Sequence, residues 1–119
     1  MTSLYDAYND QEAARKREQE RDRFIHSDEH KNMWIKQGFA KEIVDKYPEE
    51  FFYMDWSLTH CGFPVEEVES YGDFHAGTIH YFLNKDYSAE FLAEYFSHEW
   101  KMDKSEVEAI ITKVKAAQA

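Results

Sequence analysis

The sequence predicts a mainly α-helical protein, folded as a single compact domain of five or six helices. Apolar residues recur at helical spacing in several segments. Residues typical of helix starts, Ser, Asp or Pro, precede these segments, and Gly, which is typical of helix ends, follows them. The length of 119 residues suits one domain. An α+β alternative stays open, in which residues 50–60 and 76–84 pair as a small sheet, because apolar residues also alternate in both segments.

Residues 1–23 are expected to form a polar helical arm or a frayed N-terminus, next to a single globular helical domain over residues 24–119. Residues 10–23 are strong helix formers, yet only Ala13 and Ala14 could pack. The segment also holds a candidate phosphate-binding strip, made of Arg15, Lys16, Arg17, Arg21 and Arg23. Interleaved acids leave this strip nearly neutral, so a solvated arm is the better interpretation.

The first core residues follow from Phe24 onward. Ser27 precedes two acids and is predicted to begin a helix that ends at Gly38. A further short helix is predicted over residues 39–47, where apolar residues line one side before Pro48 ends it.

The segment from Pro48 to Gly62, PEEFFYMDWSLTHCG, is expected to be the central core helix. Proline suits the first helical position, the two glutamates favour the positive end of the helix dipole, and glycine suits a left-handed stop. We expect Trp56 to share the core with an apolar stripe between Phe91 and Trp100. Cys61 falls on the predicted apolar face that carries Met54 and Leu58, and it is expected to be a buried, inert thiol.

A small and very acidic helix is predicted next, with Val65, Val68 and Tyr71 on one face and Gly72 at its end. Residues 73–84 are harder to assign, and we expect a loop with one turn of helix there.

The last third of the chain is predicted to form a helical hairpin. Asp86 or Ser88 begins its first helix, and Asp103 with Glu106 forms a capping-box pattern before the second. The second helix has apolar residues at helical spacing, namely Val107, Ile110, Ile111 and Val114.

Residues 92–114 of this hairpin resemble a DNA-binding helix-turn-helix, in the opening LAEYF and in the second helix SEVEAIITKV. The resemblance implies a small transcriptional regulator as the alternative function. The intervening HEWKMD makes a longer turn than the motif has, and Glu106 and Glu108 stand where a groove-binding helix needs hydrogen-bond donors.

The net charge of −10 is confined to the middle of the chain. Residues 38–100 contain 13 acids and 3 bases, whereas residues 1–37 sum to −1 and residues 101–119 to +1. Such a block repels nucleic acid and anionic membranes and attracts basic protein surfaces. Because no apolar run reaches membrane-spanning length and the N-terminus lacks a secretory pattern, we expect a cytoplasmic protein with no membrane association.

Two histidine patterns are candidate metal sites. His26 to His30 spell H-x-x-E-H, a zinc-peptidase pattern, but Ser27 is expected to cap a helix and separate the two histidines. Asp73, His75 and His80 lack a defined fourth ligand. We therefore expect surface histidines, no catalytic residue, no metal and no cofactor.

The sequence favours a non-enzymatic acidic binding protein that engages a basic protein surface. A nucleic-acid mimic that inhibits a DNA- or RNA-handling enzyme, in the manner of small phage-type inhibitors, is one form of such a protein. No direct nucleic-acid binding is expected in this reading. The candidate partner-binding residues are acids with one aromatic among them, namely Glu49, Glu50, Asp55, Glu66, Glu67, Glu69, Tyr71 and Asp73.

Overall fold

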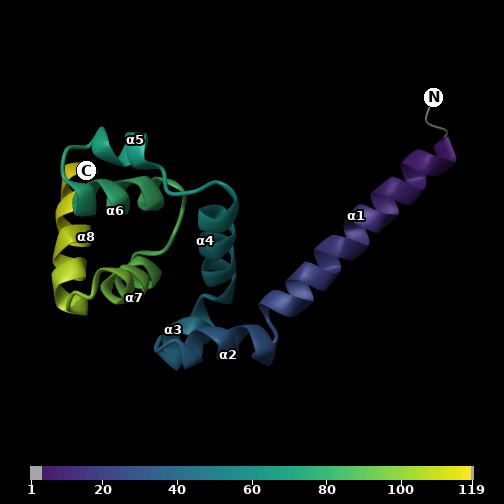
Figure 1. Ribbon diagram of the computed structural model, residues 1–119, viewed down its shortest axis with the longest axis horizontal. Helices are drawn as coiled ribbons and strands as arrows, with labels where there is room; N and C mark the ends of the chain where they lie inside the picture. The colour runs from purple at the N-terminus through teal and green to yellow at the C-terminus, as the bar shows by residue number, and fades with distance from the viewer. Residues whose placement is uncertain (1–3, 119) are drawn as a thin grey trace.

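The computed structural model describes residues 4–118, which form helices and connecting loops and contain no strand (Figure 1). The mainly helical prediction is confirmed. The described residues form more helices than the five or six expected, namely α1 (Leu4–Ile25), α2 (Asp28–Lys36), α3 (Lys41–Lys46), α4 (Pro48–His60), α5 (Val65–Glu69), α6 (Phe74–Asn84), α7 (Ala89–Trp100) and α8 (Lys104–Gln118).

The α+β alternative is not supported, because residues 50–60 lie in α4 and residues 76–84 lie in α6. The expectation of a loop with one helical turn over residues 73–84 is also wrong. The Asp73 side chain accepts a hydrogen bond of 2.9 Å from the Ala76 backbone N–H, which caps the start of α6. Apolar residues alternate here because α6 is packed on several sides, and this pattern also fits a strand.

Helix α1 extends away from the other helices, and only its C-terminal end packs against them, on α2 and α4 (Figure 1). Ile25 at that end is buried, whereas the side chains from Asp10 to Arg23 are exposed apart from the half-buried Ala14. The radius of gyration is 17.7 Å, against roughly 13–14 Å for a compact chain of this length. The difference reflects the projecting helix.

The core is a cluster of aromatic and aliphatic residues that joins α2, α3 and α4 to α6, α7 and α8. Phe51 on α4 is fully buried, and its ring centroid lies 5.2 Å from that of Trp34, 5.1 Å from Phe39 and 4.8 Å from Phe91. Tyr95, one turn further along α7 than Phe91, packs against both Phe39 and Phe51. Helix α7 is therefore the element through which the C-terminal helices contact the N-terminal ones.

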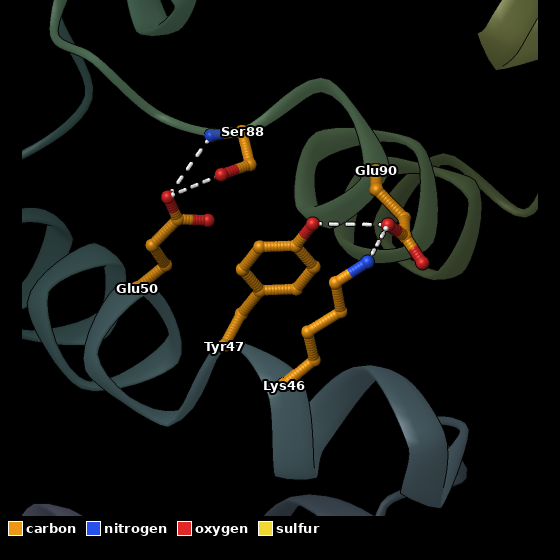
Figure 2. Close-up of polar contacts among 5 residues, drawn as sticks. All are labelled: Lys46, Tyr47, Glu50, Ser88 and Glu90. Atoms are coloured by element: carbon orange, nitrogen blue, oxygen red, sulfur yellow. Dashed lines mark hydrogen bonds and ion pairs between the residues drawn. The ribbon is translucent and has the colours of Figure 1, made fainter.

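Two carboxylates, those of Glu50 and Glu90, connect the start of α7 with α3 and α4 through four hydrogen bonds (Figure 2). The backbone N–H and the hydroxyl of Ser88 both donate to Glu50 Oε1, at 3.0 and 2.8 Å. Glu90 Oε2 accepts from Lys46 Nζ at 2.8 Å and from the Tyr47 hydroxyl at 2.9 Å. These hydrogen bonds lower the pKa of Glu90, the one from Lys46 most strongly, so its carboxylate is stabilised in the charged form.

Trp56 is not in the core, contrary to the prediction from sequence. Its side chain is 47 % exposed and stacks on His60, with ring centroids 4.6 Å apart. Helix α4 buries Phe51 and Met54, and Trp56 lies five residues after Phe51, which at about 100° per residue places it well off that face. The apolar stripe of α7 is buried as expected, since Phe91, Leu92, Tyr95 and Phe96 are all core residues.

Gly77 lets α5 lie directly on α6. A Cβ atom at this position would overlap the Val68 backbone carbonyl of α5. The short acidic helix is thus held against α6 by a contact that only glycine permits.

Replacing Phe96 with Ala is expected to cost about 3–5 kcal/mol of unfolding free energy, because it empties a buried aromatic site. Replacing Trp56 with Ala should cost less than about 1 kcal/mol, because the ring is half exposed. Denaturant titration of both variants tests this. Equal losses would show that Trp56 supports the core in solution.

Replacing Gly77 with Ala should destabilise the protein by about 1–3 kcal/mol, through the overlap with α5. Helix propensity alone predicts the opposite sign, a gain of up to about 1 kcal/mol. Thermal unfolding measures the difference, and Ala109→Gly on the exposed side of α8 calibrates the propensity effect. A stabilised Gly77→Ala variant would contradict the close contact.

Candidate functional site

Helix α5 and the start of α6 present carboxylates and apolar side chains together at the surface. We call this surface the acidic face, and its residues are Val65, Glu66, Glu67, Glu69, Tyr71, Asp73 and Phe74. Its three apolar members are large and unusually exposed, at 48 % for Val65, 45 % for Tyr71 and 50 % for Phe74. Exposed apolar groups ringed by charge are typical of a surface that binds another protein.

The carboxylates of the acidic face have no basic partner among the described residues. The ion pairs in this part of the chain join His26 to Glu49, Lys46 to Glu90 and Lys104 to Glu94. Asp73 caps α6, and the three α5 glutamates are exposed. The acidic face therefore keeps its negative charge available to an outside partner.

The two aromatic residues of the acidic face, Tyr71 and Phe74, pack against other aromatic rings. The Tyr71 ring lies 3.9 Å from that of His80 on α6, and the Phe74 ring lies 5.6 Å from that of Phe63. Phe74 also approaches Trp100 at the end of α7, at 6.5 Å. These contacts hold the exposed rings in place, which lowers the conformational entropy that binding would cost.

The predicted acids of α4 form a separate group, since α4 packs on α1, α2 and α3 whereas α5 packs on α6. Glu49 lies 3.2 Å from His26 Nε2, and Asp55 is exposed. Glu50 is partly buried and accepts the hydrogen bonds from Ser88, so it is part of the fold. The eight predicted partner-binding residues thus lie on two surfaces, and Glu50 also has a structural role.

The H-x-x-E-H pattern does not form a metal site. Helix α1 ends at Ile25 and α2 begins at Asp28, with the Ser27 hydroxyl accepting from the His30 backbone N–H. The prediction that Ser27 caps this helix is confirmed. The two histidines therefore lie on either side of a helix boundary, unlike those of a zinc peptidase.

The expectation that His30 lies on the surface is wrong, because its residue exposure is only 2 %. Its Nδ1 donates to the Ile25 carbonyl at 2.8 Å, and its Nε2 accepts from Trp34 Nε1 at 3.0 Å. Both ring nitrogens are occupied, so neither is free for a metal. Among the side chains that the structure describes, those of residues 10–118, no three His, Cys, Asp or Glu residues gather as metal ligands, and this includes Asp73, His75 and His80.

Cys61 is exposed, contrary to the expectation of a buried thiol. Helix α4 ends at His60, and Cys61 is the C-cap residue. The chain then turns at Gly62, whose φ is +78°. The thiol therefore does not continue the buried face of the helix.

The C-terminal hairpin has a shorter turn than the sequence indicated. Helix α7 continues to Trp100 and α8 begins at Lys104, which leaves three connecting residues with Lys101 in the left-handed conformation. The longer-turn interpretation is wrong, because residues His98 to Trp100 are helical. Glu106 and Glu108 are exposed in the first two turns of α8.

Comparison of the chain with models of protein families, with curated proteins and with solved structures found no match. Within residues 4–118, none of the helices has both the length and the apolar composition that crossing a membrane requires.

Replacing His30 with Ala is expected to cost about 2–4 kcal/mol, because it leaves a cavity and removes the acceptor for the buried Trp34 N–H. His26→Ala should change the unfolding free energy little, since its contact with Glu49 is exposed. Chemical denaturation of the two single variants compares them directly. Similar stabilities would mean that His30 is not buried in solution.

Proposed function

We propose that this protein is a non-enzymatic binding protein, acting in the cytoplasm, whose acidic face engages a basic surface of another protein. The observation that carries the proposal is the combination of exposed Val65, Tyr71 and Phe74 with unpaired carboxylates on the same short surface. Opposite charge speeds the encounter, and the apolar groups add contact area once the two surfaces meet.

A purely solubilising role explains the carboxylates alone but not the exposed apolar side chains. Surfaces that only maintain solubility are expected to combine charges of both signs and to lack apolar patches. The acidic face has the opposite composition, since it contains no basic residue. This composition supports a binding role over simple solvation.

A nucleic-acid mimic is the form of this function that the charge favours. Carboxylates on α5, together with Asp73, concentrate negative charge on one short segment, which a phosphate-binding protein surface would attract. In that case the partner is a DNA- or RNA-handling enzyme, and nucleic acid competes with this protein for the same site.

DNA binding by the α7–α8 hairpin is the second candidate, and the three-residue connection favours it, because helix-turn-helix motifs use turns of this length. Glu106 and Glu108 oppose it, because they place negative charge at the end of α8 that would approach phosphates. A gel-shift assay at low salt separates the two candidates, since only the second predicts a shifted band.

Reversing Glu66, Glu67 and Glu69 to Lys should weaken binding to a basic partner by about tenfold or more, through lost attraction and added repulsion. Parent affinity should fall as salt rises, because exposed charges are screened. The partner is obtained by affinity capture at two salt concentrations, and binding is then measured with the purified pair.

The matched control reverses Glu12, Glu18 and Glu20 on α1, which changes the net charge by the same amount away from the acidic face. This control should bind like the parent, and circular dichroism checks that both variants stay folded. If the α5 reversal binds as tightly as the parent across the salt range, the acidic face is not the binding surface.

A further inference from the structure

Two adjoining cavities lie between α4 and the connection from α6 to α7, and they share Lys85 and Tyr87 as walls. The first has a volume of about 290 Å³ and includes the rings of Tyr81 and Phe82. The second has a volume of about 260 Å³ and is lined mainly by acids and tyrosines, namely Glu49, Glu50, Tyr53 and Asp86. We refer to both together as the double cavity.

Glu50 in the second cavity has an unpaired oxygen. Its Oε1 accepts both hydrogen bonds from Ser88, whereas its Oε2 is buried and has no hydrogen-bond partner (Figure 2). Among the side chains described for residues 10–118, it is the one buried oxygen or nitrogen atom without a hydrogen-bond partner. A buried carboxylate oxygen without a donor is unfavourable, and a group with N–H donors and positive charge would satisfy it. Because this oxygen has almost no exposed surface in the free protein, the side chains around it must shift before such a group can pair with it.

The first cavity also favours a cation, for independent reasons. Its walls include Tyr81, Phe82 and Tyr87. Phe82 is buried and Tyr87 stacks on Phe91, so Tyr81 is the ring best placed to attract a positive charge with its face. The protein's own Lys85 Nζ already lies over the Tyr81 ring, 5.4 Å from the centroid. The C-terminal ends of α4 and α6 adjoin the cavity, and helix C-termini carry partial negative charge.

We propose that the double cavity binds an arginine or lysine side chain of the basic partner protein, an inference that rests on the proposed function. The aliphatic part of that side chain packs on the aromatic walls, and its charged group reaches the carboxylates around Glu50. Arginine fits best, because its planar group stacks on rings and pairs with carboxylates. In the free protein the Lys85 ammonium group lies over the Tyr81 ring, and it moves away from this ring when the partner binds.

The position of the double cavity agrees with this role. Pro64 lines the first cavity, and Val65, the first residue of the acidic face, follows it directly. A partner lying on α5 can therefore insert one side chain beside the end of α4 without a separate binding surface.

The probe for the test is N-acetyl-L-arginine methylamide, titrated into the full chain and followed by amide chemical shifts in NMR. Glu50→Gln keeps an oxygen for Ser88 and removes the charge, so it should weaken probe binding by about tenfold. Glu108→Gln on α8 removes the same charge outside the double cavity and should bind the probe like the parent.

Lys85→Met should tighten probe binding by about threefold or more, because it removes the competing cation from the Tyr81 ring. Lys113→Met on α8 makes the same change in net charge and should have no comparable effect. A purely structural role for Lys85 predicts no gain in probe affinity. A gain therefore distinguishes competition for the Tyr81 ring from a structural role.

The inference is overturned if the probe does not shift the amides of Tyr81, Lys85 and Tyr87, or if each variant behaves like its control. Suppose that reversing the α5 glutamates abolishes partner binding but the parent does not bind the probe. Only the inference about the double cavity is then wrong. Suppose instead that Glu50→Gln and Lys85→Met change probe binding as expected, but reversing the α5 glutamates leaves partner affinity unchanged. The acidic face is then not the binding surface.

Discussion

The packing around Phe51 is the interaction on which the rest of the structure depends. This side chain is fully buried and contacts aromatic rings from α2, the α2–α3 connection and α7. The helices before residue 61 and those after residue 64 share few other contacts, so this cluster sets their relative position. The Glu50–Ser88 and Lys46–Glu90 contacts then fix the direction in which α7 leaves it. Both proposed binding surfaces depend on this arrangement.

The acidic residues of the central block have two different roles in the structure. Some hold helices together: Glu50 and Glu90 secure the start of α7, and Glu94 accepts from the Ala40 backbone N–H at 2.9 Å. The glutamates of α5 make no ion pair among the described residues. The concentration of charge that the sequence shows is therefore only partly a binding feature, because the carboxylates of Glu50, Glu90 and Glu94 accept hydrogen bonds from donors elsewhere in the chain.

Part of the candidate site followed from local rules, and part did not. Val65 and Tyr71 are about half exposed, although the sequence grouped them with the buried Val68 on one apolar face. The exposure of the α5 glutamates was predictable, because charged side chains are rarely buried without a partner. The burial of His30 was not, because it needs Trp34 one turn later together with the carbonyl of Ile25 across a helix boundary. Trp56 was misplaced because hydrophobicity alone does not say which side of an apolar helix meets the core.

By itself, the sequence determined the helical class, the boundaries marked by Ser27, Pro48 and Gly62, and the confinement of negative charge to residues 38–100. These features depend on local backbone preferences and composition, which neighbouring residues largely set. Only the tertiary structure decided which acids bond to other helices, which aromatics are exposed, and that Lys85 and Tyr87 line two adjoining cavities. Those outcomes depend on contacts between residues distant in the chain, such as Glu50 with Ser88, and local patterns do not encode such contacts.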